Sequence, residues 1–82
     1  MNYNHFVYLG DTVLRVNKIV SISGVKQVDK DKYRFTVTAE GTERLFTYTN
    51  NDENIAREER TRFMTAVNQE LDKLMEYKHD RL

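Results

Sequence analysis

A long C-terminal segment, Asn50 to Leu82, contains no proline or glycine and so limits the folds that this chain can adopt. Apolar side chains recur within it at spacings of three and four residues, which is the period of one face of an α-helix. The repeating positions are Ala56, Arg60 through its aliphatic stem, Phe63, Val67, Leu71 and Leu74, flanked by Met64 and Met75. Asn50, Asn51 or Asp52 can accept hydrogen bonds from the free amides of a first turn. The sequence therefore predicts one long helix over about residues 52–78.

The first half of the chain is predicted to form an antiparallel sheet, because apolar and polar residues alternate along it. The expected strands lie near residues 3–9, 12–16, 19–28, 33–39 and 43–49. Within the third of these, Val20 and Ile22 are expected to point inward, and the apolar parity changes at Gly24, which predicts a bulge or bend. The fold class is therefore α+β, an antiparallel meander of four to five strands packed on the long C-terminal helix, in a single domain of residues 1–82.

The first hairpin is defined by its turn. Gly10 and Asp11 predict a two-residue loop of type II′, in which glycine takes the first central position. This loop fixes the cross-strand register and sorts the side chains onto two faces. The inner face is expected to carry three pairs: His5 with Val16, Val7 with Leu14, and Leu9 with Thr12. The outer face is expected to carry two: Phe6 with Arg15, and Tyr8 with Val13.

The outer face of this hairpin admits two interpretations. A curled sheet would fold the hairpin over the rest of the chain, so that Phe6, Tyr8 and Val13 form a second small core. An uncurled hairpin leaves them exposed beside Arg15, and a patch of aromatics with an arginine has the composition of an interface centre. Both interpretations stay open at the level of the sequence.

The last hairpin has two possible registers. A two-residue loop near Gly41 places Phe46 and Tyr48 inside and Leu45 outside, whereas a three-residue loop with Gly41 at a bulge reverses these faces. The first register is favoured because it buries more apolar area.

The helix is longer than the sheet it covers. Residues 52–78 would span about 40 Å, whereas a strand of seven residues spans about 23 Å. The excess falls at the C-terminal end, where Leu74, Met75 and Tyr77 continue to offer apolar surface, as a contact for a second chain or as a frayed last turn. On the solvent side, two acid–base pairs are spaced four residues apart: Glu53 with Arg57, and Glu58 with Arg62.

Few residues suggest catalysis or metal binding. Cysteine is absent, which removes disulfides, thiolate nucleophiles and cysteine metal sites. The two histidines, His5 and His79, have no recognisable catalytic setting, and Glu76 with His79 is an incomplete pair of metal ligands. We therefore expect no enzyme, with no catalytic residue, cofactor or metal.

Charge and composition narrow the class of partner. Thirteen Lys and Arg balance thirteen Asp and Glu, so no global field draws the chain onto phosphate backbones, and nucleic acid is not the expected partner. The apolar runs are too short to span a membrane, and the opening MNYNHF lacks the pattern of a secretory signal. These observations favour the cytoplasm and no membrane partner.

The sequence thus predicts a small non-enzymatic protein-binding module, typical of regulatory or inhibitory proteins of bacteria, phages and mobile elements. Its partner is another protein, a second copy, or both, because a domain of this size buries only about 60% of its unfolded-chain surface and gains from a homo-oligomer. The expected partner-binding residues are Phe6, Tyr8, Val13, Arg15, Arg34, Leu74, Met75 and Tyr77. The alternative is a single-stranded nucleic-acid-binding module, in which sheet aromatics with Arg15 and Arg34 stack on bases.

Overall fold

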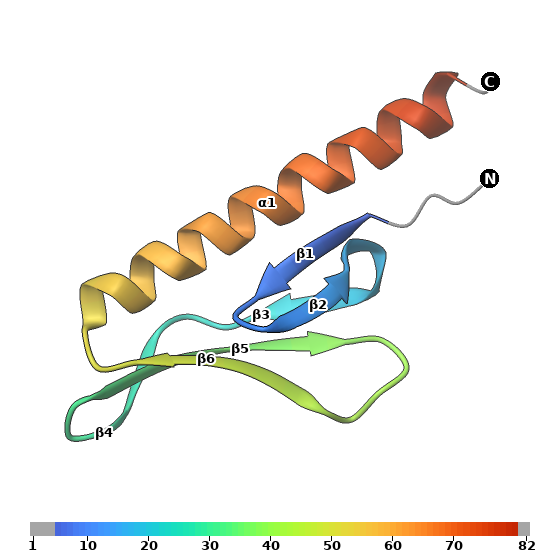
Figure 1. Ribbon diagram of the computed structural model, residues 1–82. Coiled ribbons are helices and arrows are strands. Elements are labelled where there is room, and N and C mark those ends of the chain that lie inside the picture. The colour runs from blue at the N-terminus through green and yellow to red at the C-terminus, as the bar shows by residue number, and fades with distance from the viewer. Residues whose placement is uncertain (1–4, 81–82) are drawn as a thin grey trace.

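The computed structural model describes residues 5–80, with side chains over residues 5–75 (Figure 1). Within these residues the chain forms six strands, one short 3-10 turn and one helix. The elements are β1 (Phe6–Leu9), β2 (Thr12–Arg15), η1 (Val16–Lys18), β3 (Ile19–Ile22), β4 (Lys26–Asp29), β5 (Lys32–Ala39), β6 (Leu45–Asn50) and α1 (Glu53–Asp80). The predicted α+β class, antiparallel strands packed on one C-terminal helix, is confirmed. Residues 3 and 4 of the first predicted strand lie outside the described residues.

The strands belong to two sheets. β1 and β2 form a hairpin sheet of their own, while β3, β4 and β6 all pair with β5 in a four-stranded sheet. The division occurs at η1, because this turn leads the chain out of the hairpin before β3 pairs with β5. The Lys18 C=O then accepts a hydrogen bond from the Glu40 N–H (2.7 Å), which fixes the end of the turn on the second sheet.

The third predicted strand is divided into β3 and β4 at the predicted bend. β3 pairs with the C-terminal half of β5 and β4 with its N-terminal half, and Gly24 lies between them. The expected inward direction of Val20 is wrong, because the register of β3 shifts between Ile19 and Ser21 and turns Val20 outward, 67% exposed. Ile22, in contrast, packs against the core as expected.

The register of the last hairpin places the aromatic side chains of β6 inside. Phe46 pairs with Val37 and Tyr48 with Phe35, both on the helix-facing side of the sheet, while Leu45 points out. The loop over residues 40–44 is longer than the predicted two-residue loop. The predicted faces are nevertheless correct, because the last pair of the ladder, Thr38 with Leu45, encloses an even number of residues, as a two-residue loop does, and parity is preserved.

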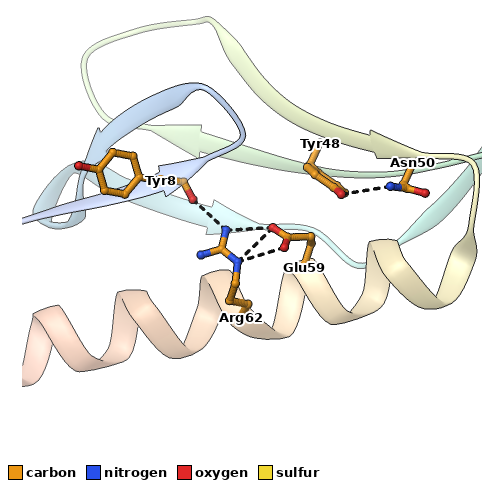
Figure 2. Close-up of polar contacts among 5 residues, drawn as sticks. All are labelled: Tyr8, Tyr48, Asn50, Glu59 and Arg62. Atoms are coloured by element: carbon orange, nitrogen blue, oxygen red, sulfur yellow. Dashed lines mark hydrogen bonds and ion pairs between the residues drawn. The ribbon is translucent and has the colours of Figure 1, made fainter.

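The hydrophobic core lies where the hairpin, the four-stranded sheet and the helix meet. Its buried members are Val7, Leu9, Leu14, Val16, Phe35, Val37, Phe63 and Val67. Phe35 is central, because its ring lies 5.6 Å from that of Tyr48 and 6.3 Å from that of Phe63, measured between centroids. The Tyr48 hydroxyl accepts a hydrogen bond from the Asn50 side-chain amide (3.2 Å; Figure 2).

The helix begins at a side-chain cap and ends beyond the strands. The Asp52 carboxylate accepts from the N–H groups of Asn54 (2.8 Å) and Ile55 (3.3 Å), which satisfies two free amides of the first turn. Farther along, the Arg60 guanidinium donates to the Ser23 C=O (2.6 Å) and ties the helix to the bend between β3 and β4. The C-terminal part of α1 then extends past the hairpin, as its length requires (Figure 1).

Candidate protein-binding surface

The outer side of the first hairpin carries four exposed side chains, Phe6, Tyr8, Val13 and Arg15, which we call the hairpin face. Their cross-strand pairing is as predicted, with Phe6 opposite Arg15 and Tyr8 opposite Val13. Phe6 is 43% exposed, Tyr8 61% and Val13 49%. The hairpin therefore presents a mixed aromatic and cationic surface to solvent, and does not fold it into a second core.

The turn of the hairpin explains why these four side chains share one face. Gly10 adopts φ +58°, and among the described residues no residue other than glycine has positive φ, as a type II′ turn with Asp11 second requires. The two-residue loop sets the register, and strand alternation then sends Val7 and Leu14 into the core. The hairpin face is consequently fixed by a local turn and a buried opposite face.

An arginine of the helix holds the hairpin by its backbone. The Arg62 guanidinium donates to the Tyr8 C=O (3.3 Å), while the Tyr8 ring points away from the helix (Figure 2). Arg62 is itself held by Glu59, at 2.9 Å, and this hydrogen bond is the main reason that the pKa of Arg62 is raised. Tyr8 is thus anchored through its main chain and leaves its side chain free.

A second contact holds the start of β1. The His5 imidazole lies 2.9 Å from the Glu70 carboxylate, which also lies 3.6 Å from the Lys73 ammonium group. The hydrogen bond with His5 is the largest cause of a lowered pKa at Glu70. His5 contacts Glu70, and Tyr8, later in β1, contacts Arg62, which is earlier in α1. Therefore β1 runs antiparallel to α1 and is attached to it at two places.

The structure separates Arg34 from the hairpin face. Arg34 lies on β5, in the four-stranded sheet, and its guanidinium donates to the Thr49 hydroxyl (3.0 Å) on the side turned away from the helix. The hairpin face belongs to the other sheet. Arg15 and Arg34 therefore do not flank one continuous aromatic surface, although the nucleic-acid alternative uses both arginines together.

The helix end provides less surface than the sequence indicated. Leu74 packs against the core, whereas Met75 is 68% exposed and Leu71 is exposed beside it. The backbone of Tyr77 is helical, and its side chain lies outside the described ones. Of the two predicted surfaces, the hairpin face is the one whose side chains the structure brings together.

The two attachments of β1 to the helix were not predicted from sequence. Spacing suggested that Glu58 pairs with Arg62, but the partner is Glu59, one residue later, because Arg62 turns toward the hairpin. The pair of Glu53 with Arg57 forms as spaced (2.7 Å). The sequence placed His5 on the inner face of the hairpin by strand alternation. It gave no signal for the partner of His5, because Glu70 is 65 residues away.

The part of the chain that the structure describes offers little to a metal ion or a small ligand. Residues 5–75 contain no group of three side chains suited to hold a metal ion, and no pocket is found there. No described helix is apolar enough over a sufficient length to cross a membrane.

Comparison of the chain with protein-family models, with curated protein sequences and with solved structures gives no match to any of them.

Proposed function

We propose that this protein is a non-enzymatic binding module, which regulates or inhibits another protein by occupying its surface through the hairpin face. The observation that carries the proposal is the exposure of Phe6, Tyr8 and Val13 beside Arg15 on one small, well-defined face. Tyrosine and arginine are enriched among the residues that dominate binding energy in protein interfaces. Apolar clusters that stay exposed are a common mark of such interfaces.

The attachment of the hairpin supports the same role. Arg62 holds the backbone at Tyr8 and Glu70 holds His5, while the inner face of the hairpin is buried in the core. A surface fixed in this way loses little conformational entropy when it binds, so more of the contact energy appears as affinity. We infer that the hairpin face is preorganised for a partner. The cysteine-free composition favours the reducing cytoplasm as the place where it acts.

A protein partner fits the charges better than a nucleic acid does. The net charge is zero, and Arg15 is the only arginine of the hairpin face, since Arg34 lies on the other sheet. Binding to phosphate backbones draws its strength from several cations and is lost steeply as salt rises. A mainly apolar contact with a single arginine is expected to vary much less with salt.

The test is affinity capture with two matched double variants. In Phe6→Asp with Tyr8→Asp, two charges are placed on the hairpin face. In the control, Val20→Asp with Leu45→Asp, the same change is made at exposed apolar positions of the other sheet. Because all four side chains are exposed, both variants are expected to fold, which circular dichroism checks.

The proposal predicts that a specific protein is retained by the wild type and by the Val20 and Leu45 control, and is lost by the Phe6 and Tyr8 variant. Retention should persist in high salt. A partner captured equally by all three proteins would contradict the assignment of the hairpin face. Capture that vanishes with moderate salt and is replaced by short single-stranded oligonucleotides would favour the nucleic-acid alternative.

A further inference from the structure

We propose that two copies of this chain pair through the free edge of β2, so that the two hairpins join into one four-stranded antiparallel sheet across a two-fold axis. Within residues 5–80, β1 is the only strand that pairs with β2, so the opposite edge of β2 has no strand hydrogen-bonded to it. Unpaired strand edges are templates for pairing with another chain. The proposal deepens the proposed function, because it names a partner for the element that carries the hairpin face.

The backbone of β2 offers hydrogen-bonding groups along this edge. The Val16 N–H donates to the His5 C=O (2.9 Å), so residues 5 and 16 form a hydrogen-bonded pair of the antiparallel ladder. Such pairs alternate with non-hydrogen-bonded ones, which assigns Tyr8 with Val13 and Phe6 with Arg15 to the second kind. The N–H and C=O groups of Val13 and Arg15 therefore point away from β1, toward the free edge.

These outward groups define one register for a symmetric pair. When Val13 is placed opposite Val13 of the second copy, each donates to and accepts from the other, as in a hydrogen-bonded antiparallel pair. A two-fold axis through this point makes the contact isologous, with the same residues on both sides. The axis stands perpendicular to the sheet, so the two outer faces point the same way.

The side chains in this register are complementary in charge. Antiparallel pairing about Val13 brings Arg15, at the end of β2 in one copy, close to Asp11, in the turn that precedes β2 of the other copy. Both side chains are exposed, and neither has an ion-pair partner among the described residues of its own chain. A register that placed like charges side by side would be destabilised by their repulsion. In this register, the two-fold symmetry gives two ion pairs, each between Arg15 of one copy and Asp11 of the other.

The pairing enlarges the hairpin face and leaves it open. Phe6 and Tyr8 lie on β1, away from the joined edges, and would remain exposed in both copies. The two hairpin faces would then form one continuous surface. A partner that is itself two-fold symmetric would meet both halves at once.

The first experiment measures the mass of the wild-type protein by light scattering over a concentration series. The proposal predicts a rise from the single-chain mass of 9.8 kDa toward twice that value. Two single variants, Asp11→Lys and Arg15→Glu, each place like charges opposite one another. Each should raise the dissociation constant of the dimer by about tenfold or more.

The decisive sample is an equimolar mixture of the two variants. In a mixed pair, Lys at position 11 meets Glu at position 15, and the native Arg15 meets the native Asp11, so the mixture should regain the wild-type dimer mass. A wild type that stays at 9.8 kDa, variants that dimerise as well as the wild type, or a mixture that stays dissociated would each overturn the pairing.

The result is separable from the test of the proposed function. The Phe6 and Tyr8 variant changes β1 and not the β2 edge, so it should lose the captured protein while keeping the dimer mass. A monomeric wild type that still loses its partner on the Phe6 and Tyr8 change would remove the pairing and keep the function. A wild type that dimerises, and whose Phe6 and Tyr8 variant still captures the partner protein, would keep the pairing and remove the proposed function of the hairpin face.

Discussion

Replacement of Phe63 or of Phe6 by alanine is expected to lower the free energy of unfolding by very different amounts, because Phe63 lies in the core and Phe6 on the hairpin face. Phe63 is fully buried on the helix, against Phe35 of the sheet, and Phe6 lies 43% exposed on β1. The chemical change is the same in both variants, so the difference between them reports burial. Phe63→Ala removes a ring from a closed environment and leaves a cavity, which costs about 3–5 kcal/mol.

That cost is large for a chain of 82 residues. Domains of this size are stable by about 4–12 kcal/mol, at about 0.05–0.15 kcal/mol per residue, so Phe63→Ala would remove about a quarter or more of the total. Phe6→Ala should cost about 1 kcal/mol or less, since much of its ring is already in water. Phe6 is thus expected to matter for binding and little for folding.

The assay is equilibrium unfolding in urea, followed by far-UV circular dichroism. Both variants and the wild type are compared at one low protein concentration, because self-association would add to the apparent stability. Equal losses of stability for Phe6→Ala and Phe63→Ala would contradict this expectation, since they would mean that the hairpin face is a second core.

Three further predictions concern the elements that position the hairpin and the helix. Asp52→Ala should lower the free energy of unfolding by about 1 kcal/mol, because two amides of the first helical turn lose their acceptor, and an unchanged urea midpoint would contradict the cap. Gly10→Ala should cost about 1–2 kcal/mol, because its φ of +58° disfavours any side chain, whereas Gly24→Ala should be close to neutral in its equally open surroundings; equal costs would remove the role assigned to the turn. The lowered pKa of Glu70 means that its carboxylate stabilises the fold above the ordinary value of 4.5, and that this contribution is lost as the pH falls through the lowered pKa. Unfolding measured over the acid range should therefore show a steeper loss of stability for the wild type than for Glu70→Gln, and parallel curves would show that the pairing with His5 contributes nothing.

The parts of the fold that could be predicted from sequence are those encoded by neighbouring residues. The turn at Gly10 fixes the register of the hairpin locally. Strand alternation alone then places Phe6 and Tyr8 on one face of the hairpin and Val7 on the other. The helix follows from the spacing of apolar residues without an interrupting proline or glycine. Even an incorrect loop length left Phe46 and Tyr48 on the correct face, since the number of residues enclosed by the last ladder pair is still even.

The parts that sequence could not provide depend on contacts between distant residues. The division into two sheets arises at η1, whose residues carry no proline or glycine to mark a change of direction. The outward turn of Val20 results from a bulge set by pairing with β5. By its spacing from Glu58, Arg62 was expected to form an ordinary ion pair on the solvent side of the helix. Only the packing of β1 on the helix shows that Arg62 binds the Tyr8 carbonyl. The exposure of the hairpin face likewise required the relative placement of hairpin and sheet.

Hydroxyl-radical footprinting shows whether the hairpin face is exposed in the free protein and covered by a partner, when it is carried out on the protein alone and after addition of the captured partner. We expect rapid oxidation of Phe6 and Tyr8 in the free protein, in keeping with their exposure, and strong protection in the complex. Leu45, exposed on the other sheet, serves as the internal reference and should react equally in both samples. Slow oxidation of Phe6 and Tyr8 in the free protein, or rates that the partner leaves unchanged, would contradict the claim that this face is held open for binding.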